Sequence, residues 1–215
     1  MAGPFRTSDL KSRILNLAQT SVFQVKMQPP EAVMAHIRDN TDINYNEDGE
    51  DIELLCSDAS LPGTSLSTHE ITGQYRGVRE RMAYRRMYDA TTDFVFYVDH
   101  DYDVIEFFDS WVDYISGVGE GQYLSKDNAK SYAANYRMNY PNSYMTNVSI
   151  AKFEKDVSTD KKIYDDGNKY YMNYTFVQAF PLNIISTPVS YQQSDVLRVT
   201  VSMAYQRYVR EKIKL

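Results

Sequence analysis

Four apolar side chains recur at helical spacing within residues 103–116 and predict a helix there. Asp103, followed three residues later by Glu106, fits a capping box, and Gly117 is placed to end the helix in a left-handed conformation. We expect this helix to lie against a sheet, because burial of the four side chains would contribute roughly 1.5–3 kcal/mol each. The stripe consists of Val104, Phe108, Trp111 and Ile115.

Alternating apolar and polar residues predict several strands. The last of them has the cleanest alternation, so we expect its apolar face on the core and its polar face in water. The two strands before it form a hairpin with a polar tip at residues 154–169, and a break at Pro181 leads from that hairpin to the last strand. The predicted strands are Ser21–Met27, Tyr144–Phe153, Tyr170–Phe180 and Val196–Gln206.

Residues 54–98 predict three further strands. A short apolar strand begins at Leu54 and ends in a loop over residues 57–70. An arginine-rich strand follows at Gln74–Tyr88, where a helix is the alternative. The strand Phe94–Val98 is apolar on both faces, so we expect it to be central and covered on both sides.

Together these elements predict a mainly β (α+β) fold. We expect a single domain over residues 1–215, a β-barrel or sandwich with one main flanking helix and a short N-terminal helix at residues 8–19. Another short helix is expected at Glu31–Arg38. The acidic residues 39–51 are expected to form a solvated loop, with a calcium site as the alternative.

Basic and acidic residues are segregated along the chain. Arg79, Arg81 and Arg85 are predicted to share one face of the arginine-rich strand, whereas residues 99–113 contain several acids and no lysine or arginine. Patches of opposite sign suit contacts between copies of one chain, so we expect both to form a subunit interface. A solvated face and a nucleic-acid surface are the alternatives. The acidic side of the interface is expected to include Asp99, Asp101, Asp109 and Asp113.

The overall charge argues against tight nucleic-acid binding. The 215 residues carry a formal net charge of −6 with a sequence pI of about 5.1, whereas phosphate binding needs a basic surface. The 19 tyrosines suit half-buried strand faces and subunit contacts. The one cysteine, Cys56, fits a reducing compartment, and no apolar run is long enough to span a membrane.

The sequence contains no recognisable catalytic, cofactor or metal motif. Asp99, Asp101 and Asp103 are the one place where a metal or acid–base site can be argued, but an EF-hand starting there would need Gly and Glu where Val104 and Ser110 stand. We therefore expect no enzyme, no cofactor and no metal. A metal-dependent enzyme and a monomeric carbohydrate-binding β-sandwich are the alternatives from other classes.

The order of several segments resembles the tail tube proteins of T-even-like contractile phages, in particular those of cyanobacterial phages. The resemblance runs from about Ser8 to Val209. SVFQVKM is followed by CSDASLPG, by QYRG, and by FVFYVD leading into the helix with FFDSWVDYISG. FVQAFPLNI and PVSYQQSDVLRVTVSMAYQRYV agree towards the end of the chain.

This resemblance implies a structural virion protein with a fold related to the ring protein of type VI secretion. Six copies would form a ring, and stacked rings would form the inner tail tube, assembled in the host cytoplasm. DNA would pass through the lumen on ejection without specific binding. The implied partners are further copies of the chain, the tail sheath protein, the baseplate hub and the tape measure protein, with no membrane anchor. Residues 29–50 and 119–141 look like insertions, so a baseplate-proximal tube initiator of the same fold is the alternative.

The same resemblance suggests where each surface would lie in a tube. We expect the polar face of Val196–Gln206, or of the hairpin strands around Thr146 and Thr175, to line the channel. A net acidic subunit suits a channel that repels phosphate mildly. The helix at residues 103–116 is expected on the outer side, near a sheath. Residues 57–70 and 154–169 are the candidates for contacts between rings.

Overall fold

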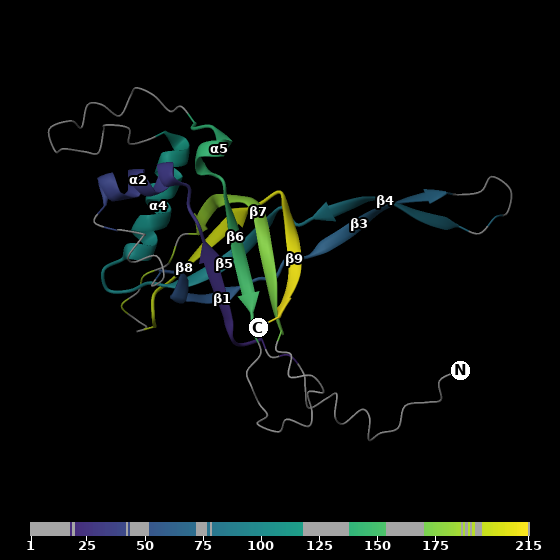
Figure 1. The fold of residues 1–215 in the computed structure, drawn as a ribbon, viewed down its shortest axis with the longest axis horizontal. Helices are drawn as coiled ribbons and strands as arrows, with labels where there is room; N and C mark the ends of the chain where they lie inside the picture. The colour runs from purple at the N-terminus through teal and green to yellow at the C-terminus, as the bar shows by residue number, and fades with distance from the viewer. Residues whose placement is uncertain are drawn as a thin grey trace, which may run out of the picture.

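Two antiparallel sheets and a pair of helices enclose one core (Figure 1). The first sheet has the order β1-β6-β7-β9 and the second the order β7-β8-β5-β2, so β7 belongs to both. The strands of these sheets are β1 (Phe23–Met27), β2 (Cys56–Ala59), β5 (Thr91–Tyr97), β6 (Thr146–Lys152), β7 (Tyr170–Ile185), β8 (Arg198–Ala204) and β9 (Arg207–Lys214). The computed structural model describes residues 18, 20–41, 43, 52–71, 77, 79–117, 138–153, 170–185, 187, 189, 191 and 195–214.

The two sheets are joined where β7 exchanges its partners. The first part of β7 pairs with β6 and β9, and the part after Phe180 pairs with β8. Gln178, at this point, has a left-handed φ of 56°, an uncommon conformation for a residue with a side chain. Next to this point of β7, β8 continues into β9 through Tyr205 and Gln206. The Gln206 amide donates to the Val177 carbonyl at 3.2 Å. β7 and the continuous pair β8–β9 therefore pass from one sheet to the other side by side.

The core lies between the sheets and is closed by two helices, α2 (Glu31–Asn40) and α4 (Asp103–Ser116). The predicted stripe of α4 is confirmed: three of its four residues are fully buried, and Ile115 is half-buried. Phe107 also points into the core and meets Phe108 edge to face, with ring centroids 5.1 Å apart. The helix therefore rests on the inner faces of the sheets, as its periodicity indicated.

The two ends of α4 form differently. Gly117 ends the helix with a left-handed φ of 70°, as predicted. The predicted capping box is wrong, because Tyr102 holds the N-cap position in a left-handed conformation and no side chain caps the helix. Asp103 and Glu106 lie instead in the first turn, where the helix dipole stabilises negative charge.

The strands near residue 54 and residue 94 differ from expectation. Leu54 lies in a helical turn and is 71% exposed, and the strand β2 begins only at Cys56. β5 is an interior strand, paired with β2 and β8, but only one of its faces is buried. Phe94 and Phe96 point into the core, whereas Tyr97 on the other face is 37% exposed. A run of apolar residues therefore did not mean that both sides of the strand are covered.

The end of the chain also differs. Pro181 does not break β7 but lies buried within it, beside a register shift. The predicted last strand is confirmed as β8, with Val199, Val201 and Met203 buried on one face. It is not the last strand, because β9 follows it directly and pairs with the first half of β7.

The arginine-rich segment forms a hairpin that projects from the body, termed the arm below (Figure 1). It consists of β3 (Thr64–Ile71) and β4 (Glu80–Tyr88), so the predicted loop at residues 57–70 is mostly a strand. A bulge in β4 opposite Ser67 and Thr68 shifts the register, so that Arg81 pairs with Glu70 and Arg85 with Ser67. Side chains alternate along β3, which places Arg81 and Arg85 on opposite faces and makes the prediction of a shared face wrong.

The region after β1 contains α2 and part of the acidic loop. α2 confirms the predicted short helix and buries Val33 and Ile37. Ile43 is 4% exposed and joins the core, so the expectation of a wholly solvated loop at residues 39–51 is wrong at this position. The predicted helix at residues 8–19 lies outside the described residues except for residue 18, and the polar tip at residues 154–169 lies outside them entirely. Residues 42 and 44–50 of the first insert-like segment and residues 119–137 of the second are also outside the described residues.

Phe108→Ala is expected to lower the free energy of unfolding by about 3–5 kcal/mol, because it leaves a cavity between α4 and β5. The Phe108 ring is fully buried and its centroid lies 5.2 Å from that of Phe96. Urea denaturation of dilute protein measures the loss. Glu106→Gln, on the exposed side of the same helix, should lower stability by no more than about 1 kcal/mol, the usual size of the helix-dipole contribution that it removes. An equal loss in both variants would contradict the packing described here.

Candidate assembly interfaces

The first sheet ends in two strands that have one neighbour each among the described residues. β1 pairs with β6 alone, and β9 pairs with β7 alone. Each outer edge therefore carries backbone N–H and C=O groups that no described strand pairs with, and such groups can pair with a strand of another chain. At the end of β1 the Met27 amide donates to Glu53 Oε1 at 2.7 Å, so a strand added there would have to displace this side chain. Because the two edges lie at opposite ends of one sheet, that sheet can continue from copy to copy.

The outer face of the first sheet is polar and carries few charges. The register sets Ser149 beside Lys26 and Thr175, and sets Asn173 beside Glu211. The neighbouring positions on β1 and β6, and Phe176 on β7, face the core. The acidic residues that give the chain its negative charge therefore lie mainly elsewhere. The face consists of Gln24, Lys26, Ser149, Ala151, Asn173, Thr175, Val177, Arg207, Val209 and Glu211.

The outer face of the second sheet combines polar side chains, such as Asp93 and Ser202, with large exposed apolar ones. Val95 faces Thr200, and Thr200 faces Ile185, which is 44% exposed. The Arg198 guanidinium lies over the Tyr97 ring, 5.1 Å from its centroid. Exposed apolar side chains on a sheet are typical of contacts with protein rather than with a water-filled channel.

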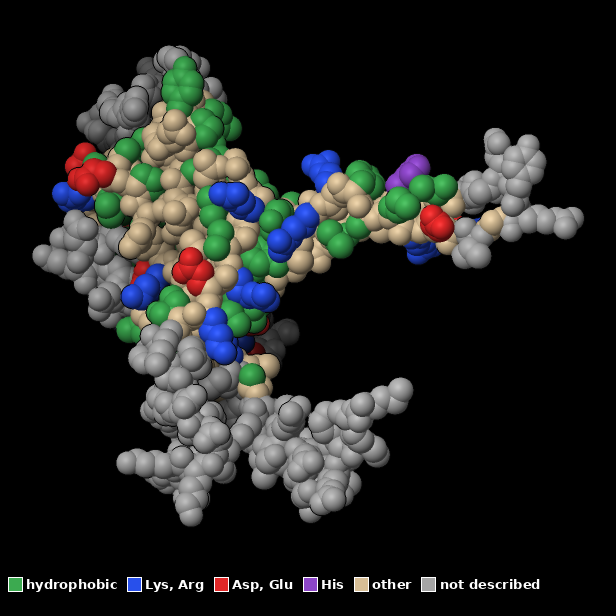
Figure 2. Space-filling view, turned by 45° about the vertical axis from the view of Figure 1, so that its right-hand side comes forward, with side chains coloured by type: hydrophobic (Ala, Val, Ile, Leu, Met, Phe, Trp, Pro, Cys, Tyr) green, Lys and Arg blue, Asp and Glu red, His purple; other side chains and the backbone are tan. Residues whose placement is uncertain are grey.

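The arm exposes apolar side chains on both of its faces, and Figure 2 shows hydrophobic side chains along the side of the arm in view. Leu66 lies on the face of Arg81, and Met82 and Met87 lie on the face of Arg85. Leu66 is 62% exposed and Met82 54%. A two-stranded hairpin is marginally stable by itself, and apolar surface on both faces indicates that it contacts another molecule.

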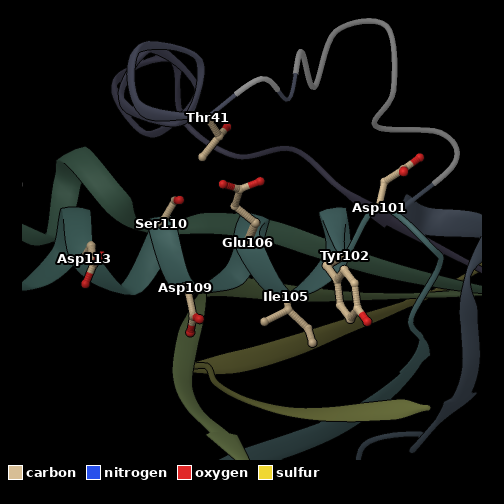
Figure 3. Close-up of a pocket in the computed structure, with 8 residues that line it drawn as sticks. All are labelled: Thr41, Asp101, Tyr102, Ile105, Glu106, Asp109, Ser110 and Asp113. Carbon is tan, nitrogen blue, oxygen red and sulfur yellow. The ribbon is translucent and has the colours of Figure 1, made fainter. Parts of the chain in front are cut away.

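A groove of about 450 Å³ runs along the exposed side of α4, termed the acidic groove (Figure 3). Glu106 points from α4 towards Thr41, which follows the end of α2, while Asp109 and Ile105 point to the other side. The groove combines carboxylates with the apolar surface of Ile105 and Tyr102, so it fits a basic segment that also carries apolar groups. Its lining residues are Thr41, Asp101, Tyr102, Ile105, Glu106, Asp109, Ser110 and Asp113.

The four acidic residues predicted for the interface occupy two environments. Asp101, Asp109 and Asp113 line the acidic groove. Asp99 precedes these residues in the sequence, does not line the groove and is half-buried. Burial, and secondly the negative charge of Asp113, raise the pKa of Asp109 above its usual value. One oxygen of Asp99, Oδ1, is buried with no hydrogen-bond partner in the described part of the chain. A positive group from a partner, placed beside Asp99 and Asp109, would offset the free energy that their burial as carboxylates costs.

The predicted basic side of the interface lies far from the acidic side within one copy. Arg79, Arg81 and Arg85 are on the exposed arm, which leaves the body on the side away from α4 (Figure 1). Arg79 forms an exposed ion pair with Glu70 at 3.5 Å, a contact worth little in water. The two patches can therefore meet only between copies.

The described residues contain no group of three or more His, Cys, Asp or Glu side chains placed to hold a metal ion. Within the same residues, no helix combines the length and the apolar character needed to cross a membrane. Burial raises the pKa of the Cys56 thiol to about 12, so it is not an activated nucleophile.

A family model described as phage tail tube protein matches residues 18–211. The chain belongs to the phage tail tube protein family.

A chain in the anti-feeding prophage baseplate structure, which is 6-fold symmetrised, shares the fold with this tail tube protein at a TM-score of 0.50 and 11% identity. The match covers 91% of this chain and 97% of that one. A chain of the sheath–tube complex of an extracellular contractile injection system, in its extended state, has a TM-score of 0.49 and 10% identity over 98% of this chain and 100% of that one. A crystal structure of an Hcp protein has a TM-score of 0.41 and 10% identity over 90% and 98%. No curated protein matches the sequence.

Two exposed strands of this tail tube protein, β9 and β3, were not predicted from the sequence. β9 carries Arg207, Arg210 and Lys212, and charged residues are typical of an exposed edge strand. Val209 and Ile213 alternate with Arg210 and Lys212, and this alternation is the signal that the chain continues as a strand. β3 has no such signal, because both faces of the arm are exposed.

Asp109→Asn is expected to raise the free energy of unfolding at pH 7. Because the pKa of Asp109 is raised in the folded protein, ionisation of this group costs stability as the pH rises from about 3.9 through the folded pKa. The variant should lack that loss, and its advantage should vanish at pH 3, as measured by urea unfolding at both values. Asp101→Asn controls for the removal of one negative charge from the same groove. An equal gain in both variants would attribute the effect to overall charge.

Proposed function

We propose that this tail tube protein is a structural subunit whose copies close into a ring of six and stack into the inner tube of a contractile phage tail. The observation that carries the proposal is the first sheet, which has an open edge at each end and a polar outer face. Edge-to-edge addition of β9 of one copy to β1 of the next would pair both of these edges and leave no edge of the first sheet exposed in a closed ring. The baseplate structure with the same fold is described as 6-fold symmetrised, which supports the ring size.

The polar face of the first sheet is the face that would line the channel. Of the two faces expected from the sequence, the one that includes Thr175 is favoured over that of β8, because the latter lies beside exposed Tyr97 and Ile185. Hydroxyl and amide groups with few charges would let DNA pass without tight binding, since strong phosphate binding needs many basic groups. The mild repulsion expected from the net charge has no support on this face, which combines Lys26 and Arg207 with Glu211.

The acidic groove and the arm are proposed as contacts beyond the ring. α4 lies on the core side of the first sheet, opposite the polar face, and would therefore be on the outer side of the tube, near the sheath. The arm would reach a copy in the next ring, and its Arg79, Arg81 and Arg85 would meet acidic residues there, including Asp99, Asp101, Asp109 and Asp113.

The remaining assignments follow from this role. The subunit would be part of a virion, assembled in the host cytoplasm, with the baseplate hub and the tape measure protein as further partners and with no catalytic activity or cofactor. A baseplate-proximal tube initiator is the second candidate, favoured by the shared fold with a chain in a baseplate structure. An initiator would give single rings in negative-stain images at every concentration, and a main tube subunit would give tubes.

Disulfide crosslinking tests the edge-to-edge contact. Lys26→Cys on β1 and Val209→Cys on β9, combined with Cys56→Ala, are expected to give a ladder of crosslinked species ending at the hexamer. Within one copy two strands separate these positions, about 14 Å at ordinary strand spacing, whereas a disulfide needs Cα atoms closer than about 7 Å.

Each single-cysteine variant is the control and should stay uncrosslinked, because equivalent positions of a ring are far apart. Moving the second cysteine by two residues in either direction along β9, which keeps it on the same face of the sheet, covers other registers between copies. Only monomers across the whole series, at concentrations where rings are seen, would contradict the pairing of β1 with β9.

Shortening the arm tests its role in stacking. Replacement of residues 66–86 by Asn-Gly would close the hairpin directly after the pair Ser65 and Met87, in a turn that this dipeptide favours. No core residue is removed, so circular dichroism and the unfolding midpoint should change little. Tubes are expected to be lost while crosslinked rings persist. Tubes of unchanged length from the shortened protein would remove the arm from this role.

A further inference from the structure

The arm leaves the body through a short base, and its direction has to be set there. Every residue of β4 from Glu80 to Met87 is exposed, and Tyr88 is the first that is half-buried. Among the described strands, β3 and β4 pair with each other alone. With the 8 residues of β3 the arm is about 26 Å long, so a swing of about 10° at the base would move the tip by about 4–5 Å, nearly one strand spacing.

An arginine lies between two tyrosines at this base. The guanidinium carbon of Arg86 is 4.8 Å from the ring centroid of Tyr88 and 5.8 Å from that of Tyr208. The two rings meet edge to face, with centroids 5.5 Å apart and an interplanar angle of 83°. Arg86 Nε also donates to Thr64 Oγ1 at 3.0 Å, which ties the guanidinium to the facing strand of the arm. The cation is thus held by both strands of the arm and by one residue of the body.

That residue of the body belongs to β9, the open edge of the first sheet. Tyr208 stands opposite Phe176 in the core and also contacts Tyr174, with centroids 6.2 Å apart. A cation over an aromatic face and an edge-to-face pair of rings both have preferred geometries, so they restrict angle as well as distance. The contact therefore relates the direction of the arm to the edge strand.

A second contact holds the chain at the start of the arm. The Gly63 amide donates to Asp89 Oδ2 at 2.9 Å, and a Cβ at position 63 would lie 2.5 Å from that oxygen. This contact joins the two connections that lead into and out of the arm. It does not involve β9, so it leaves the tilt of the arm towards the sheet edge to the cluster of Arg86, Tyr88 and Tyr208.

We propose that Arg86, held between Tyr88 and Tyr208, is a positioning residue that sets the angle of the arm on the open edge of the first sheet. The same cluster then orients the two elements that meet other copies of the chain, β9 and the arm. Its effect on assembly rests on the proposed tube function, whereas its effect on the arm of a single subunit does not.

Distance measurement in the isolated subunit tests the angle directly. Spin labels on Thr68→Cys in the arm and Lys26→Cys in the body, in a Cys56→Ala background, report the arm-to-body distance by pulsed electron resonance of dilute protein. A narrow distribution is expected, which Arg86→Gln should broaden or shift by several ångströms. Arg86→Lys keeps the charge without the planar group. The width of its distance distribution should lie between the widths for the unmodified protein and for Arg86→Gln.

Arg85→Gln is the matched control for the distance, because Arg85 lies one residue away on the opposite face of the arm. Tyr208→Phe keeps the ring and should retain the narrow distribution, whereas Tyr208→Leu should behave as Arg86→Gln does. Circular dichroism verifies that each variant is folded. An unchanged distribution in both Arg86→Gln and Tyr208→Leu would overturn the proposal, whether or not tubes form.

Assembly provides the second readout. Arg86→Gln is expected to raise the concentration needed for tube formation at least about 5-fold, while Arg38→Gln on α2, which also removes one positive charge, should leave it unchanged. A broadened distance together with normal assembly would overturn the role of Arg86 in stacking. Failure of the unmodified protein to assemble would contradict the proposed function instead, and the distances would still decide the position of the arm.

Discussion

The contact between the aromatic inner faces of the two sheets is the interaction on which the rest of the structure depends. Phe176 of the first sheet meets Phe94 of the second edge to face, with centroids 6.1 Å apart, and meets Tyr205 at 4.8 Å. Because β7 and the continuous pair β8–β9 run through both sheets, this contact sets their relative position. It leaves the β1 and β9 edges and both outer faces outside the core, where they are available to other copies.

The surfaces outside the core differ in chemistry according to the element that supports them. The first sheet presents hydroxyl and amide groups, the second presents Tyr97 and Ile185, and α4 presents carboxylates. The arm carries arginines next to exposed methionines. A subunit built in this way can assign a different neighbour to each surface, because charge and apolar area select their complements. Backbone pairing along the edges would supply binding energy without this selectivity.

Periodicity located the elements that have one side in the core. The spacing of Val104, Phe108 and Trp111 gave α4, and strict alternation gave β1, β6 and β8, because half-burial repeats with the period of the backbone. β3 lies in the arm with both faces in water and has no such period, so the sequence predicts a loop there, whereas its partner β4 falls within a predicted strand. Ile43 is a single apolar residue among acidic ones, and nothing local shows that it reaches the core.

The sequence by itself determined the mainly β class, the position of the long helix and the separation of acidic from arginine-rich segments, since each depends on neighbouring residues alone. Only the tertiary structure decided which arginines share a face and which strands are edges. The bulge opposite Ser67 and Thr68 separates Arg81 from Arg85, and the pairing of β9 with β7 makes β9 the open edge of the first sheet. Both depend on hydrogen bonds to a partner strand, and the identity of that partner is not encoded in any local pattern.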